Sequence, residues 1–406
     1  MNILIVSQYF WPENFRVNDL ALSLKQKGHS VTVLTGKPNY PDGNFFDGYW
    51  AFSNSEEDFH GIRVRRVPLV SRGSSKGLRL ALNYFSFAFF ASLLGPFYCR
   101  EKYNAIFVFE PSPITVGLPA IVLKKLTGTP IFFWVLDLWP ESLSATGAVS
   151  SAFILKAVGG LVRFIYSRCD RILVSSKGFV NRVSWAGGAR EKIFYFPNWT
   201  EEIYARAPEQ VWPSSMPMPE GFKIIFAGNV GAAQSFPTIL DAAENLKDEP
   251  DIHWIIIGDG RMLDWVKTQI KLRGLAGCVH LLGRHPPEDV VGLLAAADAL
   301  LVTLKKDPVF SLTVPGKMQS YMACGKPIIA CLDGEGAALI DESSSGLACP
   351  AENAAALAKA ALALRDMSEE ERKRMGENAA RYCEANFNRA MLMDKLENWL
   401  KDTTKK

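Results

Sequence analysis

The feature that most constrains the fold is an alternation of apolar strands with amphipathic helices, which runs along the first half of the chain. Residues 2–6 predict a strand, Val17, Leu20, Ala21 and Leu24 recur at helical spacing, and residues 30–34 predict a second strand. A strand, a helix and a strand in this order predict a parallel βαβ unit. Further strands are expected at 63–70, 105–110, 130–136 and 171–175, with helices at 118–126 and 152–167.

The same alternation restarts after a proline-rich stretch. Strands are expected at 223–227, 253–257, 279–282, 299–303 and 327–331, and helices at 236–246, 262–273, 289–296 and 316–324. A chain of 406 residues is long enough for two domains. We expect an α/β domain at 1–198, a linker at 199–221, a second α/β domain at 222–385 and a helix at 386–406 that crosses back to the first domain. The sheets are expected to face each other across a cleft, with the C-terminal helices 354–364, 369–386 and 390–401 packing back across it.

Composition and charge limit the compartment and the classes of binding partner that we expect for this chain. The seven cysteines include no C-x-x-C pair, so we expect free thiols in a reducing compartment, and we expect no signal peptide before the first strand. Residues 1–200 carry 22 Lys/Arg against 13 Asp/Glu, whereas residues 201–406 carry 23 against 29. The basic excess is either a solvated surface or a surface that meets an anionic partner, for which phospholipid, a pyrophosphate-linked substrate and nucleic acid are candidates.

Residues 80–99 form an apolar segment without a charged residue, between Arg79 and Arg100. Pro96 is expected to end this helix near Gly95, which leaves about 16 residues, or roughly 24 Å, short of a bilayer core. A core helix, a helix that also enters the membrane interface and a true span all stay open. The aromatic residues, with Lys76 and Arg79 beside them, favour the interface of an anionic membrane.

Several reaction chemistries lack their motifs. The sequence has no H-E-x-x-H, G-x-S-x-G or G-x-x-x-x-G-K-[ST], no D-x-D pair, and no histidines at metal-ligand spacing. We therefore expect neither a metal nor a cofactor. A bound diphosphate would then need backbone N–H groups and Lys or Arg side chains to balance its charge.

The second half offers such groups at three turns. Gly228, Asn229 and Gly231 follow the strand 223–227, the turn 258–260 (Gly258, Asp259, Gly260) follows the next strand, and Lys317 closes the loop 313–317. Each is also compatible with an ordinary tight turn. A cation in the first turn of a helix is unfavourable for the helix dipole, which favours an anion beside Lys317.

The order of motifs resembles a known family. The motifs are GHSVTVLT (28–35), FAGN (226–229), IIGDG (256–260), LGR (282–284), AAADALLV (295–302) and YMACGKPIIA (321–330). Together they resemble a family 4 glycosyltransferase with two Rossmann-like domains, the GT-B type. SQYFWPENFR (7–16), GKPNYP (36–41) and DLWPES (137–142) are similar to bacterial O-antigen and capsule transferases of the N-acetyl-L-fucosamine type.

The resemblance implies a function and a place in the cell. It implies transfer, usually with retention and without a metal, of a UDP-linked deoxy-amino sugar to an undecaprenyl-diphosphate-linked saccharide. The enzyme would be cytoplasmic and peripheral on the inner membrane, docked through residues 80–95, with no nucleic acid partner. A soluble nucleotide-sugar 2-epimerase of the same fold and a non-catalytic nucleotide-sugar-binding protein are the alternatives.

The sequence departs from the family at the donor site. Asn229 and Gln234 stand where many members have Arg and Lys, and Ser320 and Leu312 stand at the two glutamates of the E-x7-E motif. We expect Arg16, Lys317 and Arg284 to share the diphosphate instead, and the alternative is a solvated or ion-paired Arg16. The donor set expected from the resemblance comprises Arg16, Gly228, Asn229, Gly231, Gln234, Gly258, Asp259, Gly260, Arg284, Lys317 and Ser320.

Carboxylates at strand ends supply the remaining candidates. Asp137 and Glu141 follow the strand 130–136, and one of them is expected to stabilise charge on the sugar or accept the acceptor's proton. Helix capping is the alternative for Asp137. Asn14 stands where many members have glycine, and it either contacts a ligand or caps a helix. The expected acceptor set is Glu13, Asn14, Asn39, Tyr40 and Glu110.

Overall fold

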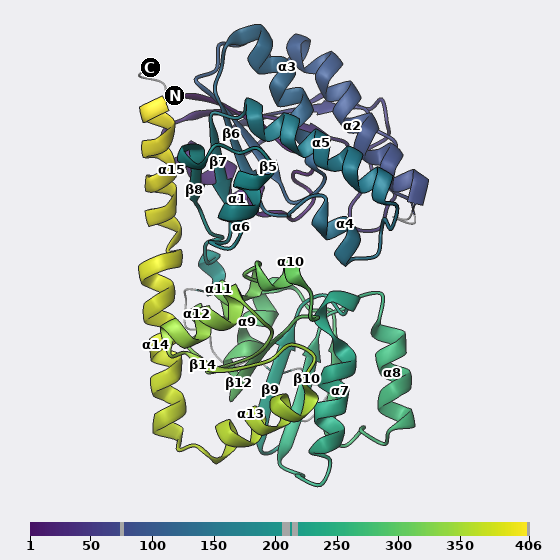
Figure 1. The fold of residues 1–406 in the computed structure, drawn as a ribbon, viewed down its shortest axis with the longest axis vertical. Helices are drawn as coiled ribbons and strands as arrows, with labels where there is room; N and C mark the ends of the chain where they lie inside the picture. The colour runs from purple at the N-terminus through teal and green to yellow at the C-terminus, as the bar shows by residue number, and fades with distance from the viewer. Residues whose placement is uncertain (74–76, 205–211, 213–217, 404–406) are drawn as a thin grey trace. The chain divides into compact units, whose positions relative to one another are not determined.

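A computed structural model describes residues 1–73, 77–204, 212 and 218–403 (Figure 1). The chain divides into two compact units, which we call the N-unit (Met1–Phe196 with Ala390–Lys406) and the C-unit (Pro197–Arg389). Of the linker expected at 199–221, residues 205–211 and 213–217 lie outside the described residues, as does Lys76. Each unit is described by itself.

The N-unit is built on an eight-stranded sheet in the order β3-β4-β2-β1-β5-β6-β7-β8. All neighbours are parallel except β3 and β4. The strands are β1 (Asn2–Val6), β2 (Ser30–Gly36), β3 (Glu56–Phe59), β4 (Ile62–Val67), β5 (Ala105–Glu110), β6 (Ile131–Val135), β7 (Arg171–Val174) and β8 (Ile193–Tyr195). Every residue of β5 and β6 is buried, as expected for parallel strands that are covered on both faces.

Helices cover the N-unit sheet. They are α1 (Arg16–Gln26), α2 (Gly77–Tyr98), α3 (Gly117–Thr127), α4 (Glu141–Ala145), α5 (Ala152–Arg168) and α6 (Phe179–Trp185), with short 3-10 turns η1 (Ile114–Val116) and η2 (Arg190–Lys192). The four apolar residues that predicted α1 are all buried, which confirms that prediction.

The C-terminal helix α15 (Arg389–Thr403) packs on the N-unit, as expected (Figure 1). The ring of Trp399 lies 5.2 Å from that of Phe194 in β8, and Glu397 lies 3.3 Å from His29. The expectation that the two preceding helices share this position is wrong. α13 (Ala354–Asp366) and α14 (Glu369–Phe387) belong to the C-unit, because their apolar faces complete its core.

Helix α2 is longer than the sequence predicts. It continues through Pro96 to Tyr98, because a proline in the last turn removes a single backbone hydrogen bond and Cys99 N–H still donates to Gly95 O at 2.8 Å. Its 22 residues span about 33 Å, close to the thickness of a hydrocarbon core. Among the described residues, α2 alone is long and apolar enough to cross a membrane, and 28% of its most apolar window is buried.

The C-unit sheet is entirely parallel, in the order β11-β10-β9-β12-β13-β14. Its strands are β9 (Phe222–Ala227), β10 (Ile252–Ile257), β11 (Val279–Gly283), β12 (Ala299–Thr303), β13 (Ile328–Cys331) and β14 (Gly346–Cys349). Its helices are η3 (Glu202–Tyr204), η4 (Ala232–Gln234), α7 (Phe236–Asn245), α8 (Leu263–Leu272), α9 (Pro287–Ala295), α10 (Pro308–Ser311), α11 (Lys317–Ala323), α12 (Glu335–Ser343), α13 and α14.

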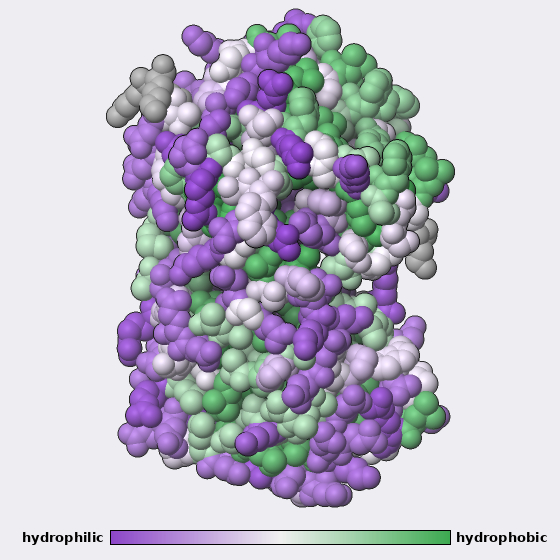
Figure 2. Space-filling view, viewed as in Figure 1, coloured by the Kyte–Doolittle hydropathy of each residue, from purple (hydrophilic) through white to green (hydrophobic). Residues whose placement is uncertain are grey.

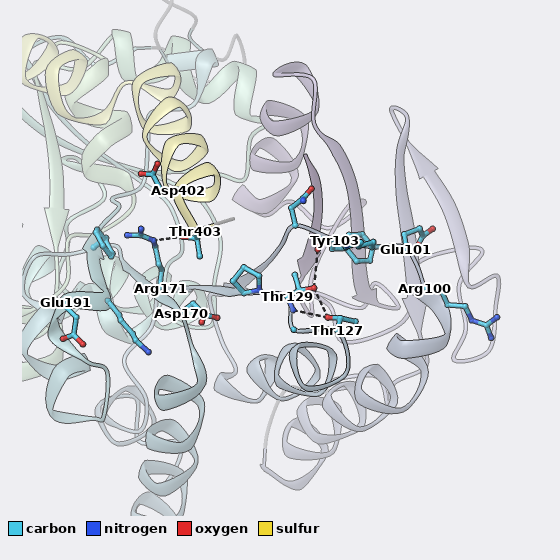
Figure 3. A pocket seen from close by; sticks show the side chains of 16 residues that line it. Arg100, Glu101, Tyr103, Thr127, Thr129, Asp170, Arg171, Glu191, Asp402 and Thr403 are labelled. Carbon is cyan, nitrogen blue, oxygen red and sulfur yellow. Dashed lines mark hydrogen bonds between the residues drawn. The ribbon is translucent and has the colours of Figure 1, made fainter. Parts of the chain in front are cut away.

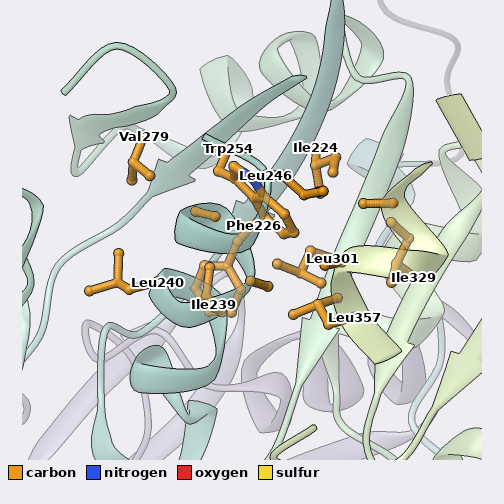
Figure 4. Close-up of a cluster of buried hydrophobic side chains, with 14 of the residues drawn as sticks. Ile224, Phe226, Ile239, Leu240, Leu246, Trp254, Val279, Leu301, Ile329 and Leu357 are labelled. Carbon is orange, nitrogen blue, oxygen red and sulfur yellow. The ribbon is translucent and has the colours of Figure 1, made fainter. Parts of the chain in front are cut away.

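Two apolar clusters hold this sheet from opposite faces. Ile224 and Phe226 enter the cluster that contains Leu357 of α13 (Figure 4), whereas Ile225 between them enters the cluster on the other face. This alternation is the period-two pattern of a strand that is covered on both sides.

The strand orders locate the ligand-binding edge of each unit. In the C-unit the order reverses between β9 and β12, and in the N-unit it reverses between β1 and β5. Open parallel sheets bind ligands beyond the carboxyl ends of the strands at such a switch point. The segments that follow β9, β10 and β12, and those that follow β1, β2, β5 and β6, are therefore where a site is expected.

Candidate functional site

Lys317 is the central residue of the C-unit edge. Its Nζ is buried, has no hydrogen-bond partner among the described residues and lies 3.5 Å from the centre of the Phe226 ring. Burial lowers the pKa of Lys317 to about 7. A buried ammonium without an acceptor is unfavourable, so this position is suited to an anion that arrives from outside the chain.

Glycines bring two turns close to Lys317. A Cβ at Gly228, where φ is +145°, would lie 3.0 Å from Lys317 Nζ. A Cβ at Gly258, where φ is +135°, would lie 1.9 Å from the carbonyl oxygen of Gly228, so neither position accepts a side chain without movement. The turns after β9 and β10 are thus packed directly against each other.

The backbone N–H groups of these two glycines are hydrogen-bonded within the fold. The N–H of Gly228 donates to Ile257 O at 2.9 Å, and the N–H of Gly258 donates to Gly283 O at 2.7 Å. Both donors are engaged within the fold, because the turns must satisfy their own backbone groups where they meet. Their role is to allow close packing beside Lys317.

Most of the expected donor residues share this edge. Asn229 and Gln234 side-chain atoms lie next to Gly231, and Asn229 Oδ1 lies next to Gly260. Asp259 accepts from the N–H of Gly260 at 2.6 Å. Ser320 is largely buried on α11, and the next residue, Tyr321, accepts from Ala227 N–H at 2.7 Å, which fixes α11 to the end of β9.

The two expected arginines are placed differently. Arg284 is exposed after β11, and no contact of the described residues joins it to Lys317. Arg16 is half-buried and is the first residue of α1 in the N-unit. Its side chain or backbone already has a hydrogen-bond, ionic or ring contact. The sharing of one diphosphate by Arg16, Arg284 and Lys317 stays a prediction.

In the N-unit, Glu13 is tied to backbone groups of its own unit. It is buried, and its carboxylate accepts from the backbone N–H groups of Phe10 at 3.3 Å and of Asn39 and Tyr40 at 2.8 Å each. Burial raises the pKa of Glu13 to about 7, and these hydrogen bonds offset part of that effect. Glu13 therefore positions the segment after β2, and its expected contact with the acceptor stays a prediction.

The neighbouring residue Asn14 is exposed. The N-cap of α1 is Phe15, without a side-chain cap, so the alternative interpretation of Asn14 as a cap is wrong. Asn18 instead ties the turn together, because its Nδ2 donates to Glu13 O at 2.7 Å and its Oδ1 accepts from Trp11 N–H at 3.0 Å.

Two carboxyl groups meet where β5 and β6 end. Glu110 is the last residue of β5 and is fully buried, with neither side-chain oxygen hydrogen-bonded among the described residues. Burial raises the pKa of Glu110 well above its usual range, and the nearby Asp137 carboxylate adds to this. Both effects favour the protonated form of Glu110, and its expected contact with the acceptor stays a prediction.

Asp137 is the second of these groups, and it is half-buried. Burial raises the pKa of Asp137 to about 6, although the nearby Ser142 hydroxyl and Trp139 indole favour the ionised form. Capping does not account for Asp137, since the N-cap of α4 is Pro140. Glu141, the other expected catalytic residue, is the first residue of α4 and is half-buried.

The sequence did not point to two further polar groups here. The hydroxyl of Tyr166 on α5 is buried without a partner among the described residues, and so is that of Thr115, which follows β5. Burial raises the pKa of Tyr166 well above its usual range, with Glu110, Glu141 and Asp137 among the groups that add to this. A tyrosine in an apolar helix carries no local signal of such a neighbour.

A pocket of about 940 Å³ lies at the other edge of the N-unit sheet (Figure 3). It is lined by residues at the amino ends of β5 to β8, such as Asn104 and Arg171, and Arg171 donates to Thr403 Oγ1 at 3.0 Å. Because ligands of open parallel sheets bind at the carboxyl ends, this pocket is not the candidate site.

The family models match both units. Residues 14–199 match the glycosyl transferase 4-like domain, and residues 214–382 match the glycosyl transferases group 1. The chain belongs to the family 4 glycosyltransferases. Its resemblance to that family, predicted from the motifs, is thereby confirmed.

Curated relatives and solved structures agree with this assignment. The chain is 29% identical to the probable glycosyltransferase WbjE of Pseudomonas aeruginosa, over 76% of this chain and 75% of that protein. It is 24% identical to the putative colanic acid biosynthesis glycosyl transferase WcaI of Escherichia coli K12, over 80% and 82%. Anabaena Alr3699/HepE in complex with UDP-glucose has a TM-score of 0.70 at 16% identity, over 99% of this chain and 100% of that chain. This glycosyltransferase therefore has the two-domain GT-B fold, as expected.

Proposed function

We propose that this glycosyltransferase moves a sugar from a UDP-linked donor to a lipid-linked saccharide during bacterial polysaccharide assembly. The observation that carries the proposal is the buried, unpaired Nζ of Lys317 at the switch point of the C-unit. Structures of the same fold hold UDP and UDP-glucose, and the relative WcaI is named for colanic acid biosynthesis, which supports both halves of the proposal.

The donor diphosphate is proposed to bind beside Lys317. The anion supplies the counter-charge that this Nζ lacks, and the ring of Phe226 holds the ammonium in place from the other side. The strength of a charge-assisted contact in a desolvated site makes a metal unnecessary for binding. We therefore expect transfer to persist in EDTA.

The N-unit edge is proposed to carry the chemistry at Asp137. Two neighbouring carboxyl groups whose environments push their pKa values apart usually divide the acid and base roles between them. Burial raises the pKa of Glu110 well above its usual range and so favours its protonated form, while Asp137, with a pKa of about 6, is ionised at neutral pH. An ionised Asp137 is placed to stabilise positive charge on the sugar ring, and family members of this type usually transfer with retention.

The enzyme is proposed to work at the cytoplasmic face of the inner membrane, held there by α2. The exposed apolar residues of α2 lie on one helical face, and Figure 2 shows hydrophobic side chains gathered over this part of the surface. They are Leu78, Leu82, Phe85, Phe89, Leu93 and Phe97, a set that we call the α2 stripe.

The opposite face of α2 argues for the interface and against a span. Phe87 and Ala91 are buried, and a Cβ at Gly95 would lie 3.0 Å from Leu34 of β2, so the helix is packed closely on the sheet. A helix that is held on the protein along one side presents only its other side to lipid, which is the geometry of an interfacial helix. Arg79, in the first turn of α2, favours anionic lipid.

The donor is proposed to be a UDP-linked deoxy-amino sugar, on the strength of the motif resemblance. The test incubates the purified protein with a panel of UDP-sugars and a farnesyl-diphosphate-linked N-acetylglucosamine, with EDTA and with anionic vesicles. A mass-shifted lipid product is expected. Conversion of the donor without an acceptor would indicate an epimerase, and UDP binding without turnover would indicate a binding protein.

A further inference from the structure

A second built feature of the N-unit edge is a buried chain of amides. Gln8 Nε2 donates to Asn83 Oδ1 at 2.7 Å, and Asn83 Nδ2 donates to Asn39 Oδ1 at 3.3 Å. All three side chains are at most 2% exposed. Burial of so many polar groups is tolerated only when they are hydrogen-bonded to one another, and such networks fix the segments that carry them.

The chain of amides ends on Arg72. The backbone N–H of Arg72 donates to Asn39 Oδ1 at 3.0 Å, so the segment after β4 is tied to the segment after β2 and to α2. The Arg72 side chain reaches back across the edge, where Nη1 donates to Tyr9 Oη at 2.8 Å. Segments after β1, β2 and β4 thus converge on one guanidinium.

Aromatic rings hold this guanidinium in place. Its central carbon lies 5.0 Å from the ring centre of Tyr40, 5.7 Å from that of Tyr9 and 5.9 Å from that of Tyr84. Tyr40 is 38% exposed and packs beside Phe15, with ring centres 5.1 Å apart. A planar guanidinium on aromatic faces is pre-organised for two-oxygen contact with phosphate, in a way that a lysine is not.

The position of Arg72 relates this site to the α2 stripe. Asn83 and Tyr84, which hold the network and the guanidinium, lie on α2 between Leu82 and Phe85, two members of the stripe. A lipid whose chain runs along the stripe from Leu82 toward Phe97 would have its head group near this part of α2. The same helix therefore offers an apolar path for a chain and a cation for its phosphate.

We infer that Arg72, held by Tyr9, Tyr40 and Tyr84, binds the diphosphate of a polyprenyl-diphosphate-linked saccharide whose lipid chain lies on the α2 stripe. This inference rests on the proposed function and adds to it the subsite that recognises the acceptor. The exposed ring of Tyr40, beside Phe15, provides a flat apolar surface for the sugar attached to that diphosphate.

The test is direct binding of farnesyl diphosphate to the full-length wild-type protein and to R72A, R72K and R100A. The loss of a charged phosphate contact weakens binding roughly tenfold or more in R72A, with a smaller loss in R72K. Arg100 is the matched control, because it also lies near an aromatic ring (5.9 Å from the ring centre of Phe97) and belongs to the other end of α2. Its variant should bind within about twofold of wild type, as expected for a surface charge screened by salt.

Two outcomes of this titration would overturn the inference. One is R72A that binds farnesyl diphosphate as wild type does. The other is R100A that loses as much affinity as R72A, which would mean general attraction to positive charge. UDP binding and the far-UV circular dichroism spectrum of each variant establish that it is folded.

Inorganic pyrophosphate separates a lipid diphosphate from a free one. Farnesyl diphosphate should bind roughly tenfold or more tightly than pyrophosphate, since each buried methylene adds affinity. L82S on the stripe should reduce the difference in affinity between farnesyl diphosphate and pyrophosphate. Equal binding of the two compounds by wild type would overturn the lipid assignment.

These measurements need no turnover, so they are distinguishable from a test of the transferase itself. A protein that binds farnesyl diphosphate through Arg72 but transfers no sugar contradicts the proposed function and supports the subsite. A protein that transfers sugar, with an unchanged acceptor KM in R72A, contradicts the subsite alone.

Discussion

Lys37 in the N-unit and Lys317 in the C-unit both place a buried ammonium near the carboxyl edge of a sheet, yet their surroundings differ. Lys37 Nζ donates to Ser53 O at 3.0 Å and also to Asn54 O, whereas Lys317 Nζ has no partner among the described residues. Burial lowers the pKa of Lys37 to about 8 and that of Lys317 to about 7. Burial alone does not mark a binding site, but burial without a hydrogen-bond acceptor does.

The same contrast extends to the two edges as a whole. In the N-unit, Glu13, Asn39 and Asn83 are satisfied by one another or by backbone groups, so they position the site. Among the described residues, Glu110 and Tyr166 in the N-unit and Lys317 in the C-unit are ionisable groups at these edges with buried, unpartnered atoms.

Asp137→Asn should lower kcat by about a thousandfold, since a positioned carboxylate contributes roughly 10²–10⁴ to such a step. Its affinity for UDP should be unchanged, because UDP is proposed to bind in the C-unit. Steady-state kinetics and UDP titration of the same preparation check this. A variant that loses UDP binding together with kcat would contradict the division of roles.

Lys317→Met should weaken UDP binding by about a hundredfold, because a charge-assisted contact to the diphosphate is lost. Lys37→Met is the matched control, and it should bind UDP as wild type does. Its free energy of unfolding should instead fall by about 1–3 kcal/mol, because two carbonyl groups lose their donor, and its melting temperature should fall accordingly. Calorimetric titration and thermal denaturation of both variants give the comparison, and equal UDP affinity in both variants would refute it.

Binding of UDP should depend on pH through Lys317. Above pH 7 the ammonium in the free protein has lost its proton, and a bound diphosphate restores it. UDP binding should then take up as much as one proton, and affinity should fall by about tenfold per pH unit above that pKa. Titrations at pH 8.5 in buffers of different ionisation enthalpy measure the uptake. K317R, which stays charged, should show none, and proton uptake by K317R equal to that of wild type would assign the proton elsewhere.

The smallest effect concerns Glu110. Because its folded-state pKa is raised, the folded chain binds more protons than the unfolded chain above the usual glutamate range, so its contribution to stability falls as pH rises. E110Q cannot titrate and should lack this loss. Denaturation of both proteins at pH 5 and pH 8 should show that the free energy of unfolding of E110Q, relative to that of wild type, is larger at pH 8 than at pH 5. An unchanged difference would mean that Glu110 is not held protonated.

The sequence predicted those helices and strands that leave a periodic or continuous apolar pattern along the chain. Apolar periodicity predicted α1, and apolar runs predicted the inner strands. The edge strand β3 (Glu56–Phe59) was not predicted, because it is short and polar and has no apolar pattern; it pairs antiparallel with β4. Lys317 was predicted as a ligand from its place at a helix start, since that unfavourable position is visible along the chain.

The remaining site residues depend on segments that are distant in the sequence. The sequence predicted Glu13 as a ligand contact. Its backbone partners Asn39 and Tyr40 follow a different strand, so nothing near Glu13 in the sequence indicates them. Arg72 and Asn83 meet through Asn39, and Tyr166 of α5 lies near Glu110, the last residue of β5. Propensity and spacing do not encode such convergence, so these roles required the structure.

The central claim is that Lys317 recognises the diphosphate of the donor. The most direct test titrates UDP and uridine, in EDTA, into wild type and K317M. Wild type should prefer UDP, and K317M should lose most of that preference while its affinity for uridine stays the same. A K317M protein that still favours UDP over uridine as strongly as wild type does would contradict the account.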